Sequence, residues 1–281
     1  MKQNFAQAVW ISLILLSSAV FSSAQKTVVP IVSLFYDESR EVSITDYGNL
    51  LGGVENGKFL DAKTTVGRLK GEIKFSLFNF KSGRKGEFSL GAIKNDGDAC
   101  PENYYMQPGL DVAADFALGT NASWEILPRR WQSVSLTSAD YKKAVADVLR
   151  LRGLPKSPVK IKQAVETDLD GDGKPEVLLV AHHYAEDASK NAKVGSYSFL
   201  IIRKTVGAKT QNVFVEGSFF TRQTEYYMGE YSLSGIADLN GDGKMEFIVN
   251  ISGYEEHWTK VFEIKAGKPA EIKALSYYCG V

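Results

Sequence analysis

Two short acidic stretches in the second half of the chain have the residue types and spacing of a cation site. Residues 168–176 read DLDGDGKPE, and residues 238–246 read DLNGDGKME. Carboxylate or amide side chains stand at positions one, three and five, a glycine at position six permits a sharp turn, and a glutamate follows at position nine. Oxygen donors gathered in this way suit a hard cation such as Ca²⁺. We therefore expect two calcium loops, with each lysine contributing its carbonyl oxygen: Asp168, Asp170, Asp172, Lys174 and Glu176 in the first, and Asp238, Asn240, Asp242, Lys244 and Glu246 in the second.

These loops are not EF-hands. An EF-hand needs a bidentate glutamate at position twelve, where this chain has Leu179 and Val249. Strand-forming residues follow both loops, whereas the EF-hand is flanked by helices. Four acidic side chains in the first loop against three in the second predict that the first site binds calcium more tightly. The alternative is a pair of Gly/Asp hairpin turns that bind nothing.

The loops belong to an internal repeat, because each is followed by a strand and then by a second strand that ends in a basic turn. The pattern resembles the FG-GAP or VCBS-type repeat, which in integrin-like β-propellers holds calcium in a hairpin between adjacent strands. The resemblance runs from Val165 to the end of the chain and extends to exported bacterial proteins with such loops near their ends. It implies that the side chains at positions one, three, five and nine are calcium ligands. Two units are too few to close a propeller of four to eight blades, so we expect a smaller β module.

The rest of the chain predicts a mainly β protein with one connecting helix. Residues 70–80 alternate polar with apolar side chains, and the turn at residues 82–86 indicates a hairpin. A helix is predicted after Ser138, with apolar residues at helical spacing and a stop at Gly153 and Pro155. We therefore expect an N-terminal β-rich domain at 25–135, a connecting helix at 136–155 and the repeat module at 156–281.

The N-terminus has the layout of a secretory signal peptide at residues 1–24. Lys2 precedes an apolar run, and Ser22 and Ala24 fit a cleavage site before Gln25. The alternative is an uncleaved membrane anchor, for which the run is short. Export predicts a secreted or periplasmic protein in which Cys100 and Cys279, the chain's only cysteines, form a disulfide. Two buried free thiols are the alternative.

Charge argues against a nucleic-acid partner, because Lys plus Arg and Asp plus Glu number 33 each. The pair Arg129-Arg130 is expected on a solvated face. Tyrosine doublets at 104–105, 226–227 and 277–278 are half-buried strand residues or a stacking platform. We expect a non-enzymatic binding or structural module of the cell envelope or extracellular space, with a glycan, a peptide or an envelope protein as partner and no membrane span after signal removal. Two alternatives stay open: a secreted, for instance glycan-directed, hydrolase with dispersed catalytic carboxylates, and an accessory protein whose one ligand is calcium.

Overall fold

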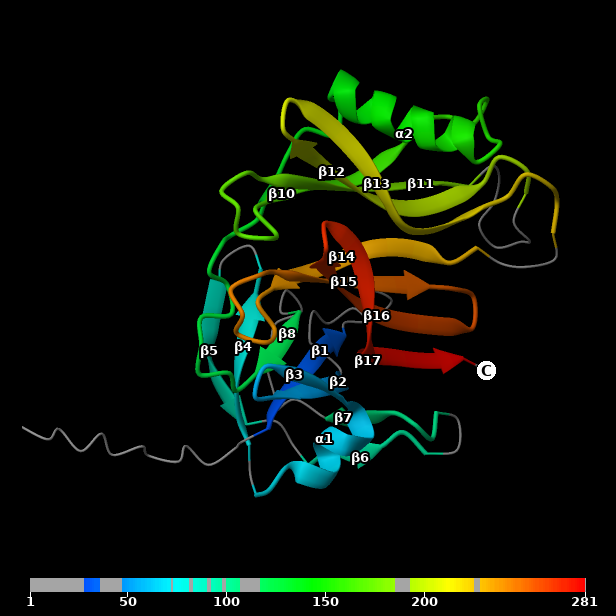
Figure 1. Ribbon diagram of the computed structural model, residues 1–281. Helices are drawn as coiled ribbons and strands as arrows, with labels where there is room; N and C mark the ends of the chain where they lie inside the picture. Colours follow the sequence, from blue (N-terminus) through cyan, green and yellow to red (C-terminus); the bar gives the residue numbers. More distant parts are fainter. Residues whose placement is uncertain are drawn as a thin grey trace, which may run out of the picture.

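The computed structural model describes residues 28–35, 47–71, 73–80, 83–89, 92–97, 100–106, 117–184, 193–224 and 228–280. These residues form three antiparallel sheets and two helices (Figure 1), so the predicted mainly β fold is confirmed. The predicted signal peptide lies outside the described residues. Neither helix in the described part has the length and apolar character that crossing a membrane demands.

Sheet 1 is built from the N-terminal part of the chain. Its strand order is β5-β4-β8-β1-β2-β7-β6, and β3 pairs with β2 beside this path. The short helix α1, Ala62–Arg68, follows β3 and is capped by the side chain of Asp61, which accepts a hydrogen bond from the Thr64 amide. The strands are β1 (Val29–Phe35), β2 (Tyr47–Glu55), β3 (Lys58–Asp61), β4 (Lys74–Asn79), β5 (Gly83–Ser89), β6 (Lys94–Asn95), β7 (Tyr104–Met106) and β8 (Leu118–Thr120).

Sheets 2 and 3 are two consecutive meanders, and sheet 2 has one strand more than sheet 3. Sheet 2 runs β13-β12-β11-β10-β9, and sheet 3 runs β14-β15-β16-β17. The two-residue strand β9 pairs with β10, so the chain enters sheet 2 before the helix α2 (Ala139–Leu151) begins. The strands are β9 (Gln132–Ser133), β10 (Ile161–Thr167), β11 (Glu176–His183), β12 (Tyr197–Val206), β13 (Lys209–Phe219), β14 (Glu230–Ala237), β15 (Glu246–Ser252), β16 (Glu256–Lys265) and β17 (Lys268–Gly280).

The three sheets are stacked, with sheet 3 in the middle (Figure 1). Helix α2 covers the outer face of sheet 2 through Ala144, Val145 and Leu149, which pack on residues such as Phe199. Gly153, at φ +81°, follows the helix as expected from the sequence. Each face of sheet 3 is therefore covered by another sheet, and the loops between its strands lie at the rim of this stack.

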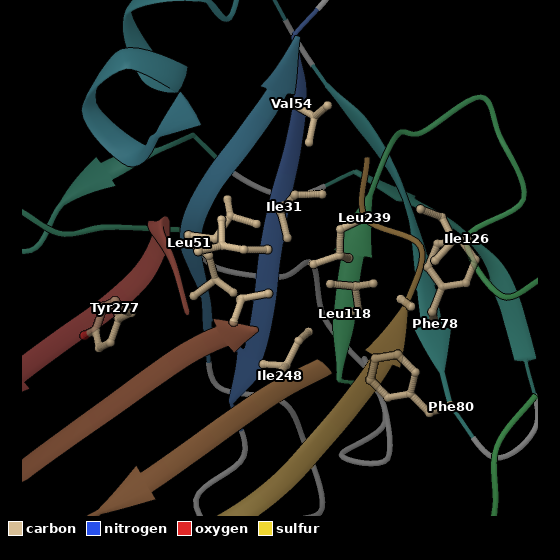
Figure 2. Packing of buried hydrophobic residues seen from close by; sticks show 14 residues of the cluster. Ile31, Leu51, Val54, Phe78, Phe80, Leu118, Ile126, Leu239, Ile248 and Tyr277 are labelled. Carbon is tan, nitrogen blue, oxygen red and sulfur yellow. The ribbon is translucent and has the colours of Figure 1, made fainter. Parts of the chain in front are cut away.

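Burial on both faces explains the apolar runs that follow the two acidic loops. In β15, Phe247 and Val249 point into the core shared with sheet 2, while Ile248 points into the core shared with sheet 1. Figure 2 shows this second core, in which Ile248 and Tyr277 meet Ile31 and Leu51. A strand that is buried on both faces has a nearly continuous apolar sequence, whereas a strand with one solvent-exposed face alternates apolar and polar residues.

One contact between sheets 1 and 3 depends on a missing side chain. A Cβ added to Gly235 in β14 would collide with the ring of Phe80, which leaves sheet 1 at the end of β4. Phe80 belongs to the core between the two sheets, and Gly235 is buried against it. The pairing of β14 with β15 has a register shift between Leu233 and Gly235.

We expect Gly235→Ala to lower the free energy of unfolding by about 1 to 3 kcal/mol, because the added methyl group must displace a buried aromatic ring. Gly67→Ala is the matched control, since a Cβ at Gly67 in α1 meets nothing within 4 Å. That variant should be neutral or up to about 1 kcal/mol more stable. Urea unfolding of both variants checks this, and equal stabilities would contradict the contact.

Candidate functional site

The two acidic loops occupy equivalent places in the two meanders. The first connects β10 to β11, where Thr167 pairs with Glu176, and the second connects β14 to β15, where Ala237 pairs with Glu246. In each case the loop closes an antiparallel hairpin, with its position-nine glutamate as the first residue of the returning strand. The repeat seen in the sequence is thus a repeat of strand position as well.

The aspartate at position one organises each loop. In the first loop the carboxylate of Asp168 accepts hydrogen bonds from the amides of Gly171 (2.7 Å) and Gly173 (3.0 Å). In the second, Asp238 accepts from the corresponding glycine amides at 2.7 and 2.9 Å. Further along, the side chain at position three accepts from the amide at position five, and position five from position seven, in both loops. Each loop is therefore wound around its own acidic side chains.

Glycine is needed at two positions of each loop. Gly173 and Gly243, the position-six residues singled out in the sequence, have φ +83° and +81°. Gly171 and Gly241, at position four, also lie in the left-handed region, at φ +78° and +77°. The sequence interpretation missed this second requirement, although the glycine recurs at the same position in both copies.

The glutamate at position nine lies beneath each loop and is buried. Glu176 is 6% exposed and Glu246 is 1% exposed. One carboxylate oxygen of each accepts a hydrogen bond from the amide of the leucine at position two, at 2.9 Å for Leu169 and 2.7 Å for Leu239. Burial and, to a smaller extent, the nearby carboxylates of Asp242 and Asp238 raise the pKa of Glu246 to about 8, although the hydrogen bond from the Leu239 amide lowers it. Burial likewise raises the pKa of Glu176.

The loops concentrate negative charge without a basic partner. Asp168, Asp170 and Asp172 each place a carboxylate oxygen within 4.8 Å of the other two. No carboxylate of either loop forms an ion pair with a lysine or arginine side chain in the part of the chain that the structure describes. Lys174 and Lys244 are exposed. A cation bound among these carboxylates would offset their mutual repulsion.

A nearby lysine is engaged elsewhere. Lys204 shares with Asp170 and Glu176 the wall of a small cavity of about 10 Å³ beside the first loop. Its ammonium group donates a hydrogen bond to the carbonyl of Gly267 in the turn between β16 and β17. The three aspartates of the first loop form a group that could hold a metal ion.

The structure also brings the two loops into contact, which the sequence did not predict. The amide of Met245, at position eight of the second loop, donates to the carbonyl of Leu169 in the first (2.8 Å). Arg129 was expected on a solvated face, and this expectation was wrong: its guanidinium donates to the carbonyls of Asp168 (2.6 Å) and Gly243 (2.7 Å). A basic doublet carries no local signal for such a contact, because its partners lie far away in sequence.

Trp124 and Ile126, in the same segment as Arg129, also hold the second loop. The indole N–H of Trp124 donates to the carbonyl of Asp238, and the amide of Asp238 donates to the carbonyl of Ile126, both at 2.9 Å. The segment between sheets 1 and 2 therefore contacts both loops.

Cys279 lies at the end of sheet 3 opposite the second loop, because it pairs with His257, which pairs with Ser252 at the far end of β15. Cys100 and Cys279 are joined in a disulfide with a Cα–Cα distance of 5.5 Å, as predicted. Asp96 lies close to both sulfur atoms, but disulfide-bonded cysteines offer no thiolate to a metal. The hydroxyl of Tyr277 donates to Asp96 at 2.9 Å, so several contacts tie β17 to sheet 1.

Both residues of the tyrosine doublet at 104–105 are half-buried, and the doublet at 277–278 divides between core and surface. Tyr277 is buried, whereas Tyr278, the next residue of β17, is exposed and packs against the ring of Trp258 at 5.2 Å between centroids. Strand alternation places neighbours on opposite faces, so this doublet offers one ring to solvent. Residues 226–227 lie outside the described residues.

Comparison with protein-family models, with curated proteins and with solved structures finds no match to this chain.

Proposed function

We propose that this protein is an exported calcium-binding β-protein that holds one Ca²⁺ ion in each of its two acidic loops. The proposal rests on one observation: two separate loops share the same hydrogen-bond pattern and the same glycine conformations, and in the first loop three aspartates place carboxylate oxygens within 4.8 Å of one another. The ligands would come from Asp168, Asp170, Asp172, Glu176 and the carbonyl of Lys174, and from Asp238, Asn240, Asp242, Glu246 and the carbonyl of Lys244. Bound calcium would supply the positive charge that these side chains lack.

Placement of the loops supports the resemblance to the FG-GAP or VCBS-type repeat. Each loop joins two adjacent antiparallel strands, which is where that repeat holds its ion. Strands β10 to β13 and strands β14 to β17 each form a four-stranded meander with the acidic loop after its first strand, which matches two repeat units of a single kind.

We infer a binding or structural role rather than a catalytic one. The loops contact each other and the segment around Arg129 where sheets 2 and 3 meet, so an ion there would hold two layers of the fold together. The disulfide supports a secreted or periplasmic location, because such bonds persist in oxidising compartments. A glycan, a peptide or an envelope protein stays the proposed class of partner.

Isothermal titration calorimetry of EDTA-treated protein tests the proposal. We expect two calcium ions per chain and weaker binding of Mg²⁺, which demands a small octahedral shell. Asp172→Asn and Asp242→Asn should each remove one ion, because the amide keeps the oxygen that accepts the Lys174 or Lys244 amide while losing the charge.

Asp140→Asn, an exposed aspartate in the first turn of α2, is the matched control and should leave two ions bound. Absence of binding at millimolar calcium would show that the loops are plain turns.

A further inference from the structure

The contact between the two loops has the form of a continuous hydrogen-bonded path. The carboxylate of Glu176 accepts from the amide of Leu169, and the carbonyl of the same leucine accepts from the amide of Met245. Met245 directly precedes Glu246, the position-nine glutamate of the second loop. Only one residue, Leu169, separates a candidate ligand of the first loop from the backbone of the second.

Arg129 forms a second connection between the loops. Its Nε donates to the carbonyl of Asp168 and its Nη2 to the carbonyl of Gly243, with a longer contact of 3.5 Å to Leu169. Asp168 is the residue around which the first loop is wound, and Gly243 holds the left-handed turn of the second. The guanidinium is planar and rigid, so its two donors fix the spacing between these carbonyls.

We propose that the two loops bind calcium as a coupled pair, in which an ion in either loop raises the affinity of the other, and that Arg129 is the positioning residue that carries this coupling. The proposal rests on the proposed function. An ion that orders one loop fixes the carbonyls shared through Arg129 and Leu169, so part of the ordering of the second loop is already complete when its ion arrives. Linkage requires the effect to be the same in both directions.

Repulsion between the two ions works against this coupling, and the carboxylates of both loops offset part of it. The two loops together contain seven carboxylates, and two calcium ions with the Arg129 guanidinium leave negative charge in excess when all seven are ionised. The second ion therefore still enters a region of net negative charge. A lysine at position 129 would keep the charge but could not donate in the same fork to two carbonyls.

Native mass spectrometry and calorimetry of the full chain with CaCl₂ provide the test. In wild type we expect the second ion to bind at least about fivefold more tightly than two independent sites allow, within the usual range of coupling between sites. Arg129→Lys should still bind two ions, but the ratio by which the second ion binds more tightly than at independent sites should fall toward one. Arg130→Lys is the matched control, because Arg130 is exposed and lies beside Gly83, and it should keep the wild-type factor.

A second measurement leaves Arg129 in place and so does not depend on how its variant folds. Asp242→Asn should weaken calcium binding at the first loop, and Asp172→Asn should weaken binding at the second by the same factor. Independent binding of two ions in wild type would overturn the coupling and leave the proposed function intact. Wild-type cooperativity in Arg129→Lys would overturn the role of Arg129, and failure of wild type to bind calcium would overturn the proposed function itself.

Discussion

Removing the disulfide is expected to lower the free energy of unfolding by as much as about 5 kcal/mol, the chain-entropy value for a loop of this length. Cys100 and Cys279 are 179 positions apart, so the bond closes most of the described chain into one loop. Without the bond, the unfolded chain gains conformational freedom. The folded protein keeps the hydrogen bonds of β17 to Asp96 and Asn103, because neither of them involves the cysteines.

Guanidinium unfolding of the Cys100→Ala/Cys279→Ala variant, compared with oxidised wild type, measures this loss. Reduced wild-type protein is the internal control and should unfold with a stability close to that of the double variant. Equal stability of the oxidised protein and the double variant would contradict the expectation.

Calcium is expected to have a second large effect on stability. An ion that binds only the folded state adds about 2.7 kcal/mol at a hundredfold excess over its dissociation constant, so two filled loops add about twice that. Asp172→Asn should lose more of this stabilisation than Asp242→Asn, because the first loop has one more acidic side chain than the second.

Unfolding of each protein in EDTA and in millimolar calcium measures the stabilisation by calcium and its loss in the two variants. Asp140→Asn should respond to calcium as wild type does. Equal stability of wild type in the two buffers would contradict calcium binding at the loops. A greater loss in Asp242→Asn would mean that burial of Asp238 and Glu246, rather than charge, sets the order of the two sites.

Features with a local cause could be predicted from the sequence. The acidic loops, the strands after them and the helix α2 follow from spacing, turn glycines and periodicity within a few residues. Alternation in residues 74–80 also held, since Phe75 and Leu77 face one core and Phe78 and Phe80 the other. Pairing of Cys100 with Cys279 followed from the cysteine count and the inferred export, without any geometry.

Features that join distant segments could not be predicted in this way. The stacking of sheet 3 between its neighbours, the pairing of β9 with β10 and the reach of Arg129 all depend on contacts that no local pattern encodes. Leu169 and Leu239 stand between positions one and three of the loops; both are fully buried, and their amides donate to the buried glutamates.

The middle position of sheet 3 has a consequence for the order in which the chain becomes able to fold. Sheet 1 and sheet 2 are complete once Phe219 has emerged during synthesis, but the strands that cover their inner faces begin at Glu230. Until β14 to β17 arrive, Ile31 and Leu51 on one sheet and Leu178 and Val180 on the other have no apolar layer over them. The last fifty or so residues therefore close both cores at once. A chain truncated before them would expose two apolar surfaces, which favour aggregation.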